Sequence, residues 1–379
     1  MAIIDIAGTR FPDRVYADRL LQTAAETASR GIGALLITPS ADYDYLLGYR
    51  APLLERLTCL ILPADGVPAL VLPLLEEPLA RHSIGALADA IEILPWEETD
   101  DPFRLVKDRL KGAPLRIGLQ DQMWSRHVLR LRALLDPAEL VDASPVTGAI
   151  RRVKQPEEID RLRATASAAD DAMLAITTER FSGRTEAEIS RRIRDLLLEA
   201  GHDAADFAIV GSGPNAASPH HEPGERVIEA GDSVVLDIGG TRAAYCSDTS
   251  RTAFVGEPPP DFAAMYEVLR LAQAAACEAV APGVPACDVD RAARRVIEEA
   301  GYGEAFFHRT GHGIGMEIHE EPYIVDSNGE PLAAGHAFSI EPGIYIAGQW
   351  GARIEDIVAC TETGGERLNT SSRELYVVD

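Results

Sequence analysis

The sequence predicts two domains of different architecture: an α/β domain with a mixed sheet (residues 1–150), followed by a duplicated α+β domain (residues 151–379). Three observations indicate this. The chain has 379 residues, which is long for one ordinary hydrophobic core. Short apolar strands alternate with helical patterns in the first part, and one helix–strand pattern occurs twice in the second part.

The first domain is expected to alternate strands and helices. Residues 57–74 contain two apolar runs around Asp65–Gly66, which predicts two strands joined by a turn. Apolar side chains recur at helical spacing in residues 101–110 and 123–135. We find no recognisable chemical motif here. Further strands are expected at residues 33–38, 91–96 and 116–120.

The second domain shows an internal repeat. Residues 191–201 (RRIRDLLLEAG) resemble residues 291–301 (RAARRVIEEAG), which predicts two equivalent helices. Residues 230–237 (AGDSVVLD) resemble residues 334–341 (AGHAFSIE), which predicts two equivalent strands that each end in an acid. Because both matches occur in the same order at offsets of 100 and 104 residues, a duplication is favoured.

Several acids follow or interrupt apolar strands in this domain. The repeat predicts equivalent places for Asp237 and Glu341, about a pseudo-two-fold axis. Asp248 follows Asp237 by eleven residues, and Glu355–Asp356 lies inside another expected strand, where period-two alternation cannot decide which acid points inward. Carboxylates are rarely buried unpaired. At an effective dielectric of ~20, each like-charged pair at ~4 Å costs about 4 kcal/mol, so cations are expected.

Two histidines accompany these acids in the segment GHGIGMEIHEEP: His312 in a glycine-rich turn and His319 seven residues later. Taken singly, each acid or histidine is typical of a cap, a turn or an ordinary polar contact. Their joint occurrence favours a metal site, because two divalent ions would neutralise four carboxylates. Oxygen ligands with one imidazole and no thiolate suit manganese, cobalt, iron or zinc.

Composition excludes several classes of function. The net charge of −24, from 36 basic and 60 acidic residues, argues against nucleic acid or an anionic membrane as a partner. The five cysteines are scattered without a CxxC pair, so neither a disulfide framework nor a thiolate metal site is expected. Residues 59–75 are apolar but interrupted by prolines, and residues 1–10 lack a signal-peptide pattern, so a cytoplasmic location is expected.

Five segments together resemble one known family. VVLDIGG, SDTSRT, GHGIGMEIHEEP, SIEPGIY and RIEDIV are similar, in this order, to the ligand motifs of the pita-bread metallopeptidases. The resemblance is to the branch of prolidases (Xaa-Pro dipeptidases) and Xaa-Pro aminopeptidases. It covers the whole chain, most strongly residues 205–360. It implies a creatinase-like N-terminal domain over residues 1–150 and a pita-bread catalytic domain over residues 151–379.

The resemblance also implies a ligand set for two divalent ions, with manganese preferred and cobalt or zinc as alternatives. In the family pattern the two aspartates chelate one ion, the histidine and the first glutamate complete the other, and Asp248 and Glu355 bridge. This selects Glu355 over Asp356. The implied ligands are Asp237, Asp248, His312, Glu341 and Glu355.

Further roles are implied for residues around these ligands. Glu341 is expected to accept the proton of the attacking water and pass it on. His220 and His319 are expected to donate hydrogen bonds to the reacting group, whereas the adjacent His221 is expected to be replaceable. Arg353 matches an arginine behind the last ligand. Ser250 stands where the family usually has threonine, a change that keeps the hydroxyl.

The implied activity is hydrolysis of the peptide bond before proline in Xaa-Pro dipeptides, by a homodimer. An Xaa-Pro aminopeptidase acting on longer peptides is the nearest alternative. A methionine aminopeptidase, creatinase itself and a metal-dependent lyase or phosphoesterase are further alternatives. A non-catalytic binding protein that kept the fold belongs to another class, and an intact ligand set argues against it.

Overall fold

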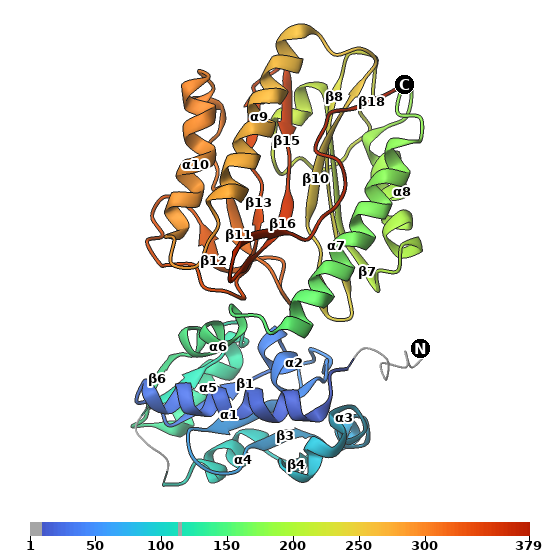
Figure 1. Ribbon diagram of the computed structural model, residues 1–379. Coiled ribbons are helices and arrows are strands. Elements are labelled where there is room, and N and C mark those ends of the chain that lie inside the picture. The colour runs from blue at the N-terminus through green and yellow to red at the C-terminus, as the bar shows by residue number, and fades with distance from the viewer. Residues whose placement is uncertain (1–9, 113–115) are drawn as a thin grey trace. The chain divides into compact units, whose positions relative to one another are not determined.

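The computed structural model describes residues 10–112 and 116–379. The chain separates into two compact units, Met1–Arg151 and Arg152–Asp379 (Figure 1). None of the helices in the described residues combines the length and the apolar character that crossing a bilayer requires.

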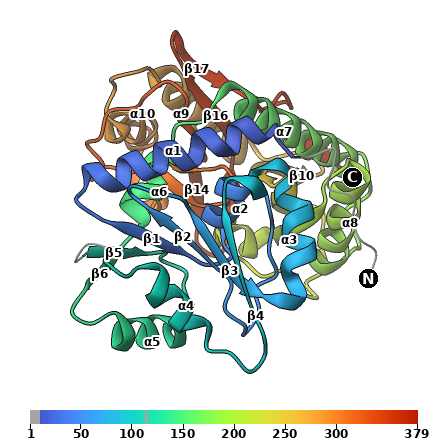
Figure 2. The same cartoon turned by 90° about the horizontal axis from the view of Figure 1, so that it is seen from below.

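The first unit is built on a mixed sheet whose strand order, within the described residues, is β4-β3-β2-β1-β5-β6. Strand β2 is antiparallel to β1 and β3, and the remaining pairs are parallel. Figure 2 shows α1 on one face of this sheet and α4 with α5 on the other. The elements are α1 (Asp13–Ser29), β1 (Ala34–Ile37), α2 (Ala41–Leu47), β2 (Cys59–Pro63), β3 (Ala69–Pro73), α3 (Glu77–Ile84), β4 (Glu92–Trp96), α4 (Pro102–Arg109), β5 (Arg116–Leu119), α5 (Ser125–Leu135), β6 (Glu139–Asp142) and α6 (Ser144–Arg151).

Alternation along β1 explains how this sheet buries both faces. Ala34 and Leu36 pack into a core with Phe103 and Val106 of α4 and Leu131 of α5. Successive side chains of a strand point to opposite faces, so the intervening residues of β1 lie on the face that carries α1. The predicted strands and helices of this unit are confirmed.

The second unit contains two sheets, each covered by a pair of helices. The first has the order β18-β10-β8-β7, with β9 paired to β8, and the second has the order β12-β11-β13-β16-β17. A ribbon of β14 and β15 accompanies them. The elements are α7 (Pro156–Thr177), α8 (Glu186–Glu199), β7 (Ala204–Ser212), β8 (Ser233–Arg242), β9 (Tyr245–Cys246), β10 (Thr249–Val255), α9 (Pro260–Ala279), α10 (Ala286–Glu299), β11 (Gly311–Gly313), β12 (Glu320–Ile324), β13 (Ala337–Ile340), β14 (Gly343–Ile346), β15 (Trp350–Arg353), β16 (Asp356–Thr361), β17 (Gly364–Arg367) and β18 (Tyr376–Val378).

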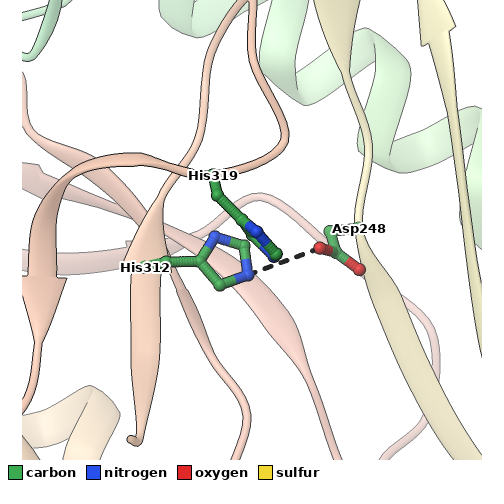
Figure 3. A group of neighbouring side chains, drawn as sticks. All are labelled: Asp248, His312 and His319. Atoms are coloured by element: carbon green, nitrogen blue, oxygen red, sulfur yellow. Dashed lines mark ion pairs between the residues drawn. The ribbon is translucent and has the colours of Figure 1, made fainter. Parts of the chain in front are cut away.

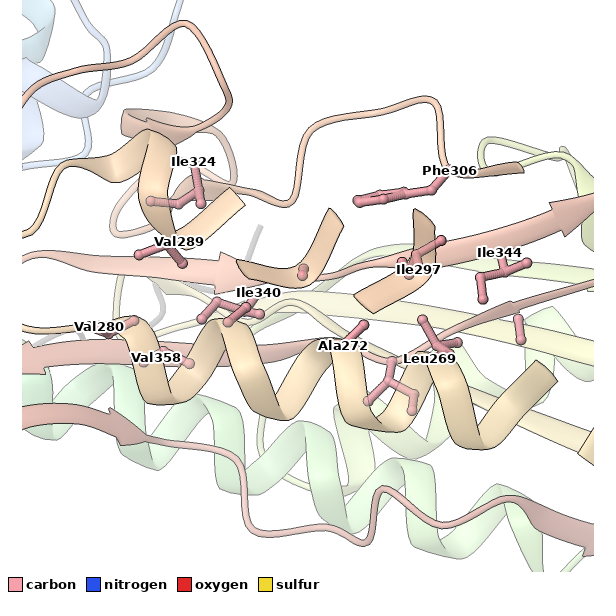
Figure 4. Close-up of a cluster of buried hydrophobic side chains, with 14 of the residues drawn as sticks. Leu269, Ala272, Val280, Val289, Ile297, Phe306, Ile324, Ile340, Ile344 and Val358 are labelled. Carbon is pink, nitrogen blue, oxygen red and sulfur yellow. The ribbon is translucent and has the colours of Figure 1, made fainter. Parts of the chain in front are cut away.

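The duplication predicted from the repeat is confirmed by equivalent helices and separate cores. Helices α8 and α10 each have 14 residues and begin 100 residues apart, at Glu186 and Ala286. Helices α7 and α8 pack on β7, β8 and β10, whereas α9 and α10 pack on the strands of the second sheet. Figure 4 shows side chains of α9, α10, β13 and β16 meeting in the second of these cores.

Three local expectations were wrong. Asp237 lies within β8 and not at its end, because β8 continues through two glycines to pair with β9. A Cβ at Gly239 would lie 2.3 Å from the carbonyl oxygen of Ser247, so this glycine permits close strand approach and does not mark a turn. Glu355 lies in the break between β15 and β16, and His312 lies in the short strand β11.

A buried ion pair joins the two sheets. Arg251 of β10 donates from Nη2 to Oδ1 of Asp356 in β16 at 2.7 Å, and both side chains are fully buried. Gln273 of α9 donates to the other carboxylate oxygen at 2.9 Å. The Arg251 Nη1 group also donates to the carbonyl of Glu355 at 2.6 Å. Both acids of the Glu355–Asp356 pair are therefore buried. Asp356 forms the ion pair with Arg251, whereas Glu355 lies in the acid cluster described below.

We expect Asp356→Ala to lower the free energy of unfolding by about 3–5 kcal/mol, because it leaves the buried guanidinium of Arg251 without its counter-charge. Urea denaturation followed by circular dichroism measures this. The control is Asp326→Ala, which removes a surface pair with Arg291 whose side chains are 66% and 50% exposed, and which should cost at most about 1 kcal/mol. Equal losses in the two variants would contradict the assigned importance of the buried pair.

Candidate metal centre

The five predicted ligands meet in the second unit, with contributions from both halves. Asp237 comes from β8 and Asp248 from the link between β9 and β10, while His312 lies in β11, Glu341 follows β13 and Glu355 precedes β16. Each residue offers an oxygen or nitrogen to groups whose ligand atoms all lie within 4.8 Å of one another. These groups are Asp237 with Asp248 and Glu355; His312 with Glu341 and Glu355; and Asp248 with His312 and His319.

Burial and mutual repulsion dominate the electrostatics of the four carboxylates. Burial raises the pKa of Asp248 well above its ordinary value, and the charges of Glu355, Asp237 and Glu341 raise it further. Burial together with Glu341 and Asp237 likewise raises the pKa of Glu355. Burial raises the pKa of Glu341 to about 7. Ionising these groups together is therefore costly unless positive charge is placed among them.

Two oxygens of the cluster test whether divalent cations fit. Asp237 Oδ1 and Glu355 Oε1 are buried and have no hydrogen-bond partner among the described residues. A buried acceptor without a donor is unfavourable, whereas a carboxylate oxygen is a normal ligand of a hard or borderline cation. The residues present therefore fit divalent metal ions held by oxygens and one imidazole.

His312 is prepared to act as the nitrogen ligand. Its Nε2 atom lies 3.3 Å from Glu341 Oε1 and 3.5 Å from Asp248 Oδ2. Its Nδ1 atom lies 3.1 Å from the carbonyl oxygen of Gly313, which assigns the proton to Nδ1 and leaves Nε2 with a lone pair. Burial, with a contribution from His319, lowers the pKa of His312 to about 3, so the ring is neutral. Figure 3 shows the rings of His312 and His319 next to each other, with the ion pair from His312 to Asp248 as a dashed line.

Arg353 orients the first aspartate. Its Nη2 group donates to Asp237 Oδ2 at 2.6 Å, which leaves Oδ1 directed to the other carboxylates. Its Nε group donates to the hydroxyl of Ser250 at 2.8 Å, and that hydroxyl donates to Glu355 Oε2 at 2.7 Å. The hydroxyl of Ser250 thus accepts from Arg353 and donates to Glu355, which a threonine hydroxyl at this position would also do.

The other predicted histidines differ in where they point. His319 is exposed, and its ring lies perpendicular to that of His312 with the centroids 4.1 Å apart. His220 is exposed on the loop after β7, and its charge contributes to lowering the pKa of His319, after burial and Arg309. His221 instead contacts the buried carboxylate of Glu186, with Nε2 and Oε2 2.7 Å apart. The structure therefore places His319 against His312 and directs His221 to Glu186, while His220 follows Pro219, whose carbonyl accepts a hydrogen bond from Arg353 Nη1 at 3.3 Å.

The sequence reasoning missed two residues of this site. Tyr345 accepts a hydrogen bond from Arg353 Nη1 at 3.0 Å, and its hydroxyl lies 3.0 Å from Nε2 of His308. Burial lowers the pKa of His308 to about 4, and Arg353 adds to the shift. A signal existed for each, since Tyr345 follows Glu341 by four residues and His308 precedes His312 by four, but neither spacing indicates a contact by itself.

Comparison with known proteins agrees with this geometry. Residues 160–362 match the family described as Metallopeptidase family M24, and residues 19–153 match the Creatinase/Prolidase N-terminal domain. The chain belongs to metallopeptidase family M24. The resemblance seen in the five motifs is therefore confirmed, and so are the creatinase-like first unit and the pita-bread second unit.

Members of family M24 that resemble this chain extend over almost its whole length. A protein of Mycobacterium tuberculosis named probable dipeptidase PepE is 47% identical over 370 residues, which cover 97% of this chain and 98% of that protein. The crystal structure of dipeptidase PepE from Mycobacterium ulcerans superimposes with a TM-score of 0.92 at 47% identity, covering 97% of this chain and 99% of the other. A prolidase from Thermococcus sibiricus gives a TM-score of 0.89 at 36% identity, with 96% and 99% covered. M24 enzymes depend on divalent metal, which agrees with the acidic cluster.

The stabilisation of the protein by manganese should increase from about pH 5 to about pH 8. A carboxyl whose pKa is higher in the folded state than in the unfolded chain destabilises the folded state, and this cost grows as the pH rises from the unfolded pKa through the folded pKa. A bound cation removes this cost, so its stabilising effect grows over the same pH window. At about pH 5 the metal must also displace protons from Glu341 and its neighbours, whose pKa values are raised. His312, with a pKa of about 3, stays neutral throughout and does not oppose the trend.

The measurement is the unfolding temperature of chelator-treated protein with and without manganese chloride. Ligand at 100 times its Kd contributes about 2.7 kcal/mol. Asp248→Asn is the control, and its gain should largely disappear at each pH. A gain that is the same at both pH values, or larger at about pH 5, would show that the raised carboxyls are not the groups that bind the metal.

Proposed function

We propose that this M24 metallopeptidase hydrolyses the peptide bond preceding proline, with Xaa-Pro dipeptides as preferred substrates. One observation carries the proposal: buried carboxylate oxygens of Asp237 and Glu355 face the cluster with no donor among the described residues. Such oxygens suit the two-cation arrangement that this reaction needs. The specificity for proline is supported by the similarity to a prolidase of Thermococcus sibiricus, and the preference for dipeptides by the similarity to proteins named dipeptidase.

Two divalent ions, manganese by preference and cobalt or zinc as alternatives, would be held by five side chains. In this proposal the residues that would hold the ions are those of two overlapping candidate groups, Asp237 with Asp248 and Glu355, and His312 with Glu341 and Glu355. When bound, the ions supply Lewis acidity and lower the pKa of a coordinated water.

Glu341 is the proposed proton carrier. In the absence of a cation, burial raises the pKa of Glu341 to about 7, so this carboxyl binds a proton more strongly than an exposed one does. The hydroxyl of Ser339 donates to its Oε1 atom at 3.1 Å and fixes the carboxylate next to His312. Glu341 would take the proton of the attacking water and deliver it to the leaving nitrogen.

His220 and His319 are the proposed donors to the developing oxyanion. Both are exposed; His319 shares a candidate ligand group with Asp248 and His312, and His220 follows Pro219, whose carbonyl is held by the same Arg353 that holds Asp237. Arg353 would keep Asp237 in place during the reaction. The proline nitrogen of the substrate is a tertiary amide without N–H, so no acceptor for that position is required of the protein.

Three further statements belong to this proposal. The domain boundary lies near Arg151, giving a creatinase-like domain (1–150) and a catalytic domain (151–379); the division of the chain after Arg151 supports this. We propose a homodimer by analogy with the resembling family. We propose a cytoplasmic location, because all five cysteines are free thiols, as is typical of proteins in a reducing compartment.

A panel of peptides distinguishes this activity from that of an Xaa-Pro aminopeptidase. With manganese added, purified protein should cleave Xaa-Pro dipeptides with a higher kcat/KM than Xaa-Pro-Yaa or longer peptides, and should leave Met-Xaa-Yaa uncut. Elemental analysis should find about two ions per chain, and chelator should abolish turnover. Equal kcat/KM for dipeptides and pentapeptides would move the assignment to the aminopeptidase, and full turnover with no bound metal would exclude both.

Replacing His220 by alanine should lower kcat by about a hundredfold, since loss of one donor to a transition state typically has this effect. Metal content should stay the same, because His220 belongs to none of the candidate ligand groups. Steady-state kinetics and elemental analysis of the same preparation measure both. The control is His82→Ala, an exposed histidine of α3 whose loss should leave kcat unchanged. A His220→Ala enzyme with normal kcat would remove this residue from the mechanism.

A further inference from the structure

A buried carboxylate that belongs to none of the candidate ligand groups lies at the start of α8. The side chain of Glu186 is fully buried. Its Oε1 atom accepts hydrogen bonds from the amide and hydroxyl of Ser212, at 2.8 and 2.7 Å, and from Nδ2 of Asn215 at 3.0 Å. Its Oε2 atom accepts from Nε2 of His221 at 2.7 Å and from the amide of Gly224 at 3.3 Å.

These donors lie on both sides of His220 along the chain. Ser212 and Asn215 precede it, and His221 and Gly224 follow it, so a single carboxylate closes the segment 212–224 into a loop. The backbone of α8 adds to this closure, because the amide of Ala187 donates to the carbonyl of Gly224 at 3.0 Å. Loop 212–224 is therefore fixed from the helix side.

The same loop is fixed from the side of the metal centre. A Cβ at Gly351 of β15 would lie 1.9 Å from the carbonyl oxygen of Ala216, so loop and strand are in direct backbone contact. Arg353 Nη1 donates to the carbonyl of Pro219 at 3.3 Å, while its Nη2 holds Asp237. His220 therefore lies between Pro219, which is held by Arg353, and His221, which is held by Glu186, and its own side chain remains exposed.

Glu186 carries its charge in this position. Burial alone raises the pKa of its carboxyl, but the hydrogen bonds from Ser212, His221 and Asn215 outweigh burial and bring the pKa below its ordinary value. An ionised carboxylate offers acceptors only, which matches a surrounding made entirely of donors. A neutral amide of the same size would direct an NH2 group at some of these donors.

We propose that Glu186 is a positioning residue for peptide hydrolysis: together with His221 it holds loop 212–224 so that His220 is presented to the substrate. The inference rests on the proposed function of His220. It differs from the expectation that His221 is replaceable, because it gives this residue a role as an anchor of the loop. The two adjacent histidines divide the work, since His221 anchors the loop and His220 acts on the substrate.

The test is a double-mutant cycle between the anchor and the histidine that it presents. Glu186→Gln and His221→Ala should each lower kcat by about tenfold or more, because a misplacement of about 1 Å costs up to about a hundredfold in rate. KM and metal content should change little. In the His220→Ala background, Glu186→Gln should lower kcat no further, because the effect acts through a group that is already absent.

Asp170→Asn is the matched control for the loss of a buried anchor. Asp170 of α7 accepts hydrogen bonds from Asn369, Thr370 and Ser371, and so ties down a chain segment that carries no predicted site residue. This variant should lower the unfolding temperature about as much as Glu186→Gln and change kcat by less than about threefold. A purely structural role of Glu186 predicts that the two variants have similar kcat values, and additivity with His220→Ala.

A second readout is independent of any activity. Amide hydrogen exchange of residues 212–224 should be faster in Glu186→Gln and His221→Ala than in the wild type, and unchanged in Asp170→Asn. Faster exchange without a loss of kcat would overturn the positioning role while leaving the loop anchor in place. Unchanged exchange would overturn the anchor itself. If His220→Ala has normal kcat but exchange responds as expected, the proposed role of His220 fails and the anchor stands.

Discussion

Repulsion among four carboxylates, three of them buried and the fourth (Glu341) half-buried, is the constraint on which the second unit depends. Asp237, Asp248 and Glu355 are at most 8% exposed, and burial together with the neighbouring carboxylates raises the pKa of Asp248 and of Glu355. Among the described residues no group donates a hydrogen bond to Asp237 Oδ1 or Glu355 Oε1. The second oxygen of each carboxylate accepts one, from Arg353 and from Ser250 respectively. The outer oxygens of these two carboxylates therefore accept hydrogen bonds from the protein, and the inner oxygens are available to bind cations. Hydrogen bonds of this kind orient the ligands of a metal centre.

Each half of the second unit has a buried carboxylate near the start of its second helix that accepts hydrogen bonds from a histidine-bearing segment. In the first half, Glu186 of α8 accepts hydrogen bonds from the segment that carries His220. In the second half, the fully buried Asp290 of α10 accepts from the amide and hydroxyl of Thr310, at 3.0 and 2.7 Å, and Thr310 lies between His308 and His312. A carboxylate near the start of the second helix therefore anchors a histidine-bearing segment in each half. Helices α8 and α10 therefore both cover a sheet and hold a segment of the site in place.

Much of this arrangement could be predicted from sequence, and the limits have physical causes. Local patterns were sufficient for the strands of the first unit, for α8 and α10, and for the family, because periodicity and motif spacing are local properties. The break at Glu355 and the continuation of β8 were missed, since both depend on which strand pairs with which. Tyr345, Glu186 and Asp290 were missed for a similar reason. Their partners Arg353, His221 and Thr310 lie 8, 35 and 20 residues away, and no spacing rule joins them.

The ion pair between Arg251 and Asp356 spans 105 residues of chain, and the hydrogen bond from Arg353 to Asp237 spans 116. Contacts of such sequence separation form late, because loop closure must precede them. During synthesis the strand that bears Asp237 leaves the ribosome well before the one that bears Arg353. A chain with only its first half folded has two acids of the centre and lacks the imidazole, the remaining glutamates and the guanidinium. The full set of candidate ligands therefore exists only after the whole catalytic unit has been translated.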